Sequence, residues 1–139
     1  MTISLSAAQA ILTAGLGHAR AAGLKPVAVV VLDAGGHPVA MAREDGATFF
    51  RAEIARAKAY GALGMGANTA VIAERARGNP TFFGGVVTTV GGDLVFSPGG
   101  VLVMAGGVVV GAVGVSGDTG ENDEAVAQAG IAAAGLAKE

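Results

Sequence analysis

The chain has 139 residues; 52% of them are hydrophobic, only 14% are charged, and the formal net charge is −2. This length suits one ordinary domain, and we predict a single domain over residues 1–139. Cysteine is absent, which excludes thiolate catalysis, disulfides and cysteine-ligated metals or haem. Because the chain is slightly acidic, we expect no nucleic-acid partner. We also expect no membrane partner, because its apolar runs are interrupted before they reach the length of a bilayer span.

The N-terminal residues 1–6 carry neither the basic start nor the apolar core of a signal peptide. We therefore expect a cytoplasmic protein. A chain with so few charged residues has difficulty covering its own surface with polar groups. Burial of apolar surface in subunit contacts is the simplest remedy, so the composition predicts a homo-oligomer.

The first half of the chain is predicted to fold as a helix, a hairpin and a second helix. Ser6 and Gln9 fit a capping box, and apolar residues follow at helical spacing. The turn-forming residues 33–36 separate two β-rich runs, of which the first is typical of a buried central strand. The predicted elements are a helix over 6–22, strands over 27–32 and 37–42, and a helix over 48–63.

The second half is predicted to contain a short helix, an irregular segment, a second hairpin and a last helix. The pair Gly106-Gly107 is a strong signal for a two-residue hairpin. The predicted elements are a helix from Asn68 to Ala76, an irregular stretch over 81–98 with a short strand at 94–96, strands over 101–105 and 108–116, and a helix from Asn122 or Asp123 to 136. The turns between paired strands are too short for parallel crossovers, so we predict an antiparallel sheet with helices packed on it, an α+β fold.

Glycine recurs at every third position in Gly111, Gly114 and Gly117, ahead of the last helix. This spacing resembles a phosphate-binding loop. However, the glycines lie within a predicted strand, and the acidic residues that follow would repel phosphate. We interpret them instead as positions where a helix or a neighbouring subunit packs closely on the strand.

Four carboxylates, Asp118, Glu121, Asp123 and Glu124, crowd the start of the last helix. They suit either a site for a hard cation or the positive end of the helix dipole. The second interpretation is favoured, because carboxylates are common in the first turn of a helix.

Basic residues gather on the second helix and just before it. Arg51 and Lys58 fall on one face of that helix, and Arg43 and Asp45 follow the second strand. Such a basic edge beside a glycine-rich turn suits the binding of a carboxylate. A solvated helix face with surface ion pairs explains it equally well, and both interpretations remain open.

The two histidines, His18 and His37, have no metal-ligand spacing to another histidine or acid. A single histidine can still be an axial haem ligand, although a structural role is more common. Tyr60 and the methionines at positions 41, 65 and 104 are further candidates for binding haem iron, and most of them are expected to fill the core.

The order of several motifs resembles the GlcG/HbpS-like family, also called haem-degrading or PduO C-terminal-like domains. The resembling segments are Val29–Gly36, Arg43–Ala47, Ile54–Ala59, Pro98–Gly100, Val110–Gly117 and Asn122–Ala127. The resemblance implies a profilin-like fold with a five-stranded antiparallel sheet and assembly from dimers to octamers. Members bind or degrade haem, bind iron or corrinoid, or have no assigned activity. Three departures from the family pattern are Glu44 in place of Met, Tyr60-Gly61 in place of a residue and Thr, and Leu102 in place of Pro.

We predict a ligand pocket where the second strand, the second helix and the turn at Gly99 and Gly100 meet, completed by a neighbouring subunit. Arg43 and Lys58 are expected to hold carboxylates, either haem propionates or a small organic acid. Asp45 and Asp123 are expected to orient the ligand or accept a proton.

Three functions are compatible with these residues. The first is binding of haem or another tetrapyrrole, or of a small ligand, by an oligomer, with His18 as the axial ligand of haem iron. The second is a small cofactor-independent isomerase or lyase for an anionic metabolite, with Lys58 or Asp45 as the acid/base. The third is an oligomeric accessory protein without pocket chemistry.

Overall fold

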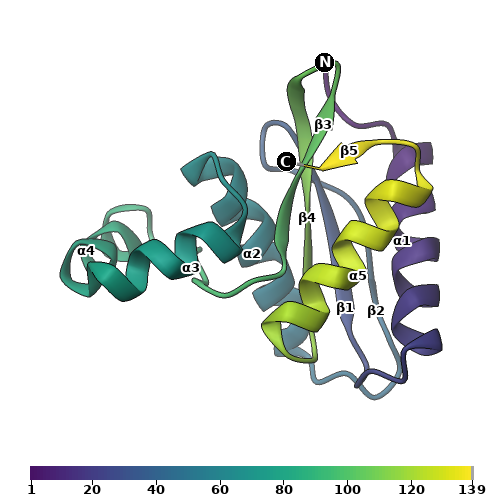
Figure 1. The fold of residues 1–139 in the computed structure, drawn as a ribbon, viewed down its shortest axis with the longest axis horizontal. Coiled ribbons are helices and arrows are strands. Elements are labelled where there is room, and N and C mark those ends of the chain that lie inside the picture. Colours follow the sequence, from purple (N-terminus) through teal and green to yellow (C-terminus); the bar gives the residue numbers. More distant parts are fainter. Residues whose placement is uncertain (139) are drawn as a thin grey trace.

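The computed structural model describes residues 1–138 (Figure 1). The helices are α1 (Leu5–Ala21), α2 (Phe50–Met65), α3 (Thr69–Gly78), α4 (Pro80–Thr89) and α5 (Gly120–Ala133). The strands are β1 (Ala28–Asp33), β2 (Pro38–Arg43), β3 (Gly100–Ala105), β4 (Val108–Ser116) and β5 (Ala137–Lys138). None of these helices is both long enough and apolar enough to cross a membrane.

The strands form one five-stranded sheet in the order β2-β1-β4-β3-β5, and all neighbours are antiparallel. The predicted α+β fold is therefore confirmed. Both predicted hairpins are present, and Gly106 (φ 58°) and Gly107 (φ 77°) form the turn between β3 and β4. These two residues adopt the left-handed backbone that glycine allows without steric cost.

Helices cover the sheet on both faces: α1 and α5 lie on one side and α2 on the other (Figure 1). Alternate residues of β1 serve the two layers. Val29 and Val31 pack with α1 and α5, whereas Val30 and Leu32 pack against α2. A strand with apolar residues on both faces is continuously hydrophobic, which is why the run in the sequence predicted it correctly.

The packing of α2 on the sheet depends on glycine. A Cβ atom at Gly114 would collide with the backbone carbonyl of Ala55, and one at Gly100 would collide with that of Lys58. Gly111 instead faces the Leu32 carbonyl of the neighbouring strand β1. The close packing of a helix that was predicted for the spaced glycines is therefore confirmed at Gly114, where the helix is α2.

Two predicted helix caps were wrong by a few residues. The N-cap of α1 is Ser4, whose hydroxyl accepts a hydrogen bond from the Ala7 N–H (3.1 Å); Ser6 lies inside the helix. The N-cap of α5 is Thr119, whose hydroxyl accepts from the Asn122 N–H (3.2 Å). In both helices the chain turns helical one residue after a hydroxyl side chain with extended backbone, ahead of the residue expected from the pattern.

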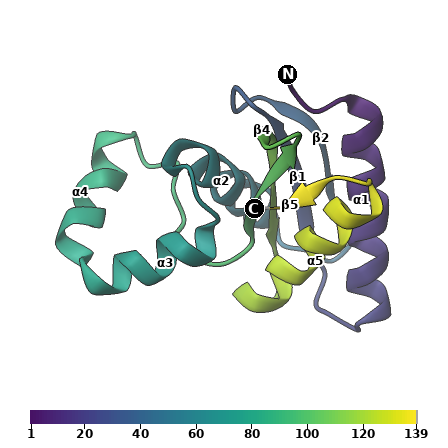
Figure 2. The same cartoon turned by 45° about the horizontal axis from the view of Figure 1, so that its top comes forward.

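The prediction of an irregular segment over 81–98 was wrong for residues 81–89 and for the short strand, whereas residues 90–98 are irregular as predicted. Residues 80–89 form helix α4, which Pro80 begins at a position where its missing N–H costs nothing. Residues 94–96 form no strand; Phe96 instead packs edge-on against Phe83, with ring centres 5.4 Å apart. We call residues 69–96 the arm, because α3 and α4 project away from the sheet and its other helices (Figures 1 and 2).

Candidate functional site

Lys58 and Asp123 form a buried ion pair beside the glycine turn that precedes β3. The Lys58 Nζ donates to Asp123 Oδ2 and to the Val115 carbonyl, each at 3.0 Å. The two side chains are only 4% and 2% exposed. Gly99 packs against the Lys58 side chain, where an added Cβ would lie 2.9 Å from Nζ. The pair thus joins α2, β4 and the start of α5.

Burial raises the pKa of the Asp123 carboxyl above its ordinary value. The backbone N–H of Asp118, which donates to Asp123 Oδ1 (2.9 Å), opposes this shift, and so does the ammonium of Lys58. Every oxygen of Asp123 is therefore engaged inside the protein. This arrangement suits an internal clamp better than a group that exchanges protons with a ligand.

Asp118, another carboxylate at this end of α5, also has partners within the protein. Asp118 accepts hydrogen bonds from the Asn122 amide (2.7 Å) and from the N–H groups of Lys25 (2.9 Å) and Thr119 (2.8 Å). These bonds lower the pKa of Asp118 to about 2, with the Asn122 bond as the largest cause. Residues 1–138 hold no group of three or more acids or histidines placed to bind a metal. The helix-terminus interpretation therefore accounts for this cluster.

Arg43 and Asp45 lie elsewhere, in a surface hollow of about 440 Å³ that they share with Arg20, Pro26 and Glu44. Glu44 bridges Arg20 (Nε to Oε2, 2.8 Å) and accepts from the Val27 N–H (2.9 Å). The departure at position 44 therefore has a local role, because its carboxylate fastens β2 to the end of α1. Arg43 donates to the Ala47 carbonyl at 2.5 Å.

The structure thus divides the residues of the predicted pocket between two places. Lys58, Asp123, Gly99 and Gly100 lie together in the interior. Arg43 lies on β2, with β1 and β4 between it and β3. The catalytic roles suggested for Lys58 and Asp45 stay predictions, but these two side chains do not line one common hollow.

His18 borders a groove of about 660 Å³ between α1 and α5. Its side chain is exposed, and no other side chain in residues 1–138 hydrogen-bonds to the imidazole. The remaining lining residues are small or apolar apart from two polar ones; they are Ala125, Gln128, Ala129, Ile131, Ala132, Leu136, Ala137 and Lys138. The groove therefore combines a free imidazole, an alanine-lined wall on α5 and a cation near the chain's last strand.

The same face of α5 carries a carboxylate that is incompletely satisfied. Glu124 Oε1 accepts from the Gln128 amide at 3.0 Å, which holds Gln128 at the groove. Glu124 Oε2 is buried and has no hydrogen-bond partner among the described residues. Buried carboxylate oxygens are nearly always paired, so a donor from outside the chain would be stabilising here.

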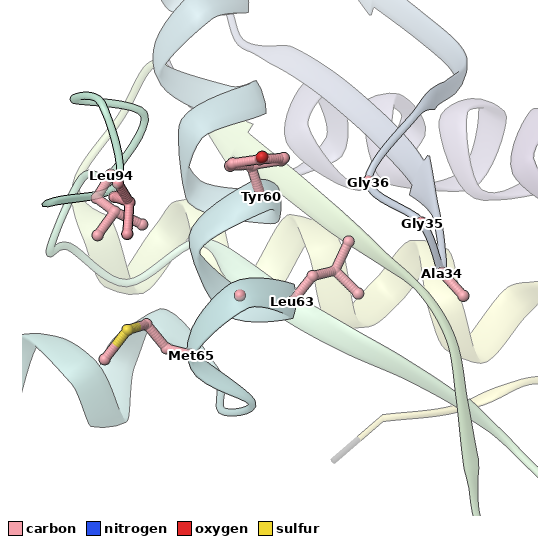
Figure 3. A pocket seen from close by; sticks show the side chains of 9 residues that line it. Ala34, Gly35, Gly36, Tyr60, Leu63, Met65 and Leu94 are labelled. Carbon is pink, nitrogen blue, oxygen red and sulfur yellow. The ribbon is translucent and has the colours of Figure 1, made fainter. Parts of the chain in front are cut away.

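Sequence reasoning missed a third hollow, which lies between α2, the turn after β1 and the end of the arm (Figure 3). Its volume is about 300 Å³, and its side chains include Tyr60, Leu63, Met65 and Leu94. These residues come from segments that the sequence keeps far apart. The only signal available was the pair Tyr60-Gly61, where the chain departs from the family pattern.

Comparison with known proteins identifies the family. Residues 3–132 match the model of the family described as haem-degrading protein, HbpS-like. The chain belongs to the HbpS-like family.

Relatives with solved structures share the whole fold of this HbpS-like chain. The protein PduOC, in a complex with haem, is 26% identical with a TM-score of 0.89, over 99% of this chain and 98% of that one. The Klebsiella pneumoniae protein ORFY is 30% identical with a TM-score of 0.89, over 97% and 92%. A variant of Streptomyces reticuli HbpS is 31% identical with a TM-score of 0.82, over 95% and 86%.

A relative by sequence is a 15.0 kDa protein of Citrobacter freundii, encoded in the dhaT-dhaS intergenic region. It is 33% identical over 106 residues, which are 76% of the HbpS-like chain and 74% of the relative. The resemblance expected from the motifs is therefore confirmed, and it extends over nearly the whole chain.

Proposed function

We propose that this HbpS-like protein binds haem in the groove between α1 and α5, with His18 as the axial ligand of the iron. The observation that carries the proposal is the exposed His18 imidazole on the wall of an alanine-lined groove of about 660 Å³. Family membership supports it, and so does the PduOC relative, whose structure is a complex with haem.

The groove fits the chemistry of haem in three respects. A neutral imidazole is a strong ligand for haem iron. Small apolar side chains at Ala125, Ala129 and Ala132 leave a wall on which a flat macrocycle can pack. Lys138 supplies a cation for a propionate. Bound haem would supply a redox-active iron, and the protein's contribution is the axial nitrogen, the apolar contact and the charge.

The competing sites are less suitable for haem. The hollow at Tyr60 has about 300 Å³, the lower end of the range for ligand pockets, and so suits a smaller molecule. The interior position of Lys58 is filled by its own partners, Asp123 and Val115. Binding is therefore favoured over acid/base catalysis at Lys58.

We further propose that the protein is a homo-oligomer in which a second subunit covers this groove. The groove is a surface depression, so one face of a bound macrocycle stays in water unless another chain covers it. The unpaired Glu124 oxygen on α5 also calls for an external donor. One haem for each pair of subunits follows from this arrangement.

The test is a titration of the purified apo-protein with haemin, followed by the visible spectrum. We expect a saturable Soret band, at least about tenfold weaker binding for His18→Ala, and loss of the ligand-dependent shift in its spectrum. His37→Ala is the matched control, because His37 is the other histidine, with a side chain that is 80% exposed and distant in sequence.

Unchanged affinity and spectrum in His18→Ala would overturn the axial assignment. Loss of binding in His37→Ala alone would move the site to the turn between β1 and β2. Sedimentation with and without haemin measures the stoichiometry, and one haem per monomer without any change in mass would contradict the shared site.

A further inference from the structure

We infer that the hollow beside Tyr60 is a second binding site, separate from the haem groove, for a small carboxylic acid with a compact apolar body. The hollow is lined by Ala34, Gly35, Gly36, Tyr60, Leu63, Gly64, Met65, Val90 and Leu94. None of these residues lines the groove at His18. The two sites lie on opposite faces of the sheet, because α2 and α1 are in different layers.

The volume and the apolar lining of the hollow determine the size and the apolar character of the ligand that it can hold. A dry cavity of about 150 Å³ is enough to bind benzene, so about 300 Å³ holds a six-membered ring and one substituent. Figure 3 shows Tyr60 and Leu63 projecting from α2, with Leu94 on one side and the turn at Ala34–Gly36 on the other. Met65 adds a soft, adaptable side chain.

Glycine keeps this space open at one wall. Gly36 is buried with φ 85°, and a Cβ there would lie 3.0 Å from the Tyr60 ring. The Asp33 carboxylate holds the turn by accepting from the N–H groups of Gly35 (3.0 Å) and His37 (2.9 Å). The turn therefore presents the backbone of Gly35 and Gly36, and only the methyl group of Ala34, to the face of the hollow opposite Leu94.

The charge of the ligand follows from Arg56. Its guanidinium carbon lies 4.9 Å from the centre of the Tyr60 ring, one turn of α2 away from the hollow. Its acidic partner is Asp93, 3.4 Å away, and the two side chains are 38% and 56% exposed. This distance exceeds the 2.7–2.9 Å of a charge-assisted hydrogen bond, so the pair is loose. A ligand carboxylate can replace Asp93 without breaking a buried contact.

Tyr60 adds a second polar group at the same place. Its hydroxyl makes no hydrogen bond with another residue in the described range 1–138, so it is free to donate to a carboxylate. Asp93 is adjacent to Leu94 and follows Gly91 and Gly92, both with positive φ. The segment that carries Asp93 therefore follows two glycines, whose backbone can change conformation at low steric cost.

The chain provides its own reporter for the test. Tyr60 is the single tyrosine, and tryptophan is absent. The tyrosine bands of the ultraviolet difference spectrum and the tyrosine fluorescence therefore report on this hollow alone. The probe is cyclohexanecarboxylate, which does not absorb in the same range, and cyclohexylmethanol is its uncharged counterpart. We expect a saturable Tyr60 signal with the acid, and binding of the alcohol weaker by about tenfold or more.

Gly64→Leu fills the hollow. Gly64 lies in α2 and lines the hollow, and a Cβ there meets nothing within 4 Å, so the new side chain enters the open space and favours the helix. Gly17→Leu is the matched control, because it is another helical glycine whose Cβ meets nothing within 4 Å, on α1. Gly64→Leu should abolish the Tyr60 signal, whereas Gly17→Leu should retain it. Arg56→Gln should weaken the acid about tenfold and leave the alcohol unchanged.

The haemin titration of Gly64→Leu separates this inference from the proposed function, because haem binding should be unaffected. Absence of a saturable signal with the acid would overturn the second site. So would equal binding of the acid and the alcohol, or retention of acid binding in Gly64→Leu with an unchanged melting temperature.

Discussion

The body of the molecule, which is the sheet with α1, α2 and α5, differs from the arm in how its core is packed. In the body, the sheet is covered on both faces, and its larger cluster joins residues of three strands with α1 and α5. The buried cluster of the arm has only Ile72 and Phe83, together with Ala67 just before the arm and a few half-buried neighbours. The body is held by many aliphatic side chains in close contact, whereas the arm is held by a small cluster centred on Phe83.

The two regions also differ in how they use glycine. In the body, glycines such as Gly114 let α2 approach the sheet more closely than any other residue would allow. In the arm, Gly84 and Gly85 lie within α4 with nothing near their Cβ positions. Each of these costs about 1 kcal/mol of helix stability relative to alanine and brings no packing in return. The arm is therefore expected to open before the body does.

The largest effect is expected where the body is tied together by charge. Lys58→Met removes one partner of the buried pair and should lower the free energy of unfolding by about 3–5 kcal/mol, because it leaves the Asp123 carboxylate without its counter-ion. Urea unfolding followed by circular dichroism measures the loss.

The double variant Lys58→Met/Asp123→Leu is the control for that loss. Replacing both charges with apolar groups should restore much of the stability, since a buried pair and its apolar replacement often differ little. A loss below about 1 kcal/mol in the single variant would show that the pair does not act as a clamp.

A smaller and more local effect is expected in the arm. Phe83 is 7% exposed and packs edge-on against Phe82 and Phe96, at 5.2 and 5.4 Å between ring centres. Phe83→Ala should cost about 3 kcal/mol, confined to the arm, because it removes the largest buried side chain of this small cluster. Hydrogen exchange should show faster exchange for α3 and α4 and little change for β1 and β4.

Phe82→Ala is the matched control, because Phe82 is 58% exposed and should change the exchange rates little. If Phe83→Ala accelerates exchange equally in the arm and in the sheet, the two regions unfold as one unit and the comparison fails.

The smallest expected effect is a pH dependence of the folding stability, which comes from the carboxylates at the start of α5. The pKa of Asp118 is lowered to about 2 in the folded chain, so its contribution to stability is present above its unfolded value near 3.8 and is lost as the pH falls toward about 2. Asp123, whose pKa is raised, acts in the opposite direction and in a different range: its contribution is lost as the pH rises from its unfolded value near 3.8 through the raised folded value.

The contribution of Asp118 is measured from the urea unfolding midpoints of wild type and Asp118→Asn at about pH 5 and about pH 2.5. The wild type should lose more stability than the variant between the two conditions, because the other carboxylates titrate alike in both. Equal losses would mean that the hydrogen bonds from Asn122, Lys25 and Thr119 do not favour the ionised form.

The sequence was most informative for the body. A β-branched run with apolar residues on both faces has few alternatives to a central strand, and Gly106-Gly107 permits a hairpin turn directly. The arm was misassigned because Gly84 and Gly85 lower the helix propensity of α4, while contact with Phe96, which lies 13 positions after Phe83, stabilises it.

The candidate sites were predicted only in part, because they depend on distance in space. Lys58 and Asp123 were both selected from the sequence, but 65 positions separate them, and only the structure shows that they bond to each other. Arg43 was placed with them because its motif belongs to the same family pattern. The strand order then put β1 between Arg43 on β2 and the strand β4, whose Val115 carbonyl accepts from Lys58. His18 was selected because a single histidine can bind haem iron, but the groove that it borders on α5 could be found only in the fold.

The composition of the arm determines how it responds to salts. From Gly78 to Gly92 no side chain carries a charge, and Phe82 and Val90 are 58% and 46% exposed. Sodium chloride, which screens charges, has nothing to screen along this stretch. Sulfate acts differently, because it is excluded from protein surfaces and raises the cost of hydrating apolar groups. At equal ionic strength, sulfate should therefore favour burial of this apolar surface, whereas sodium chloride should leave it exposed to water.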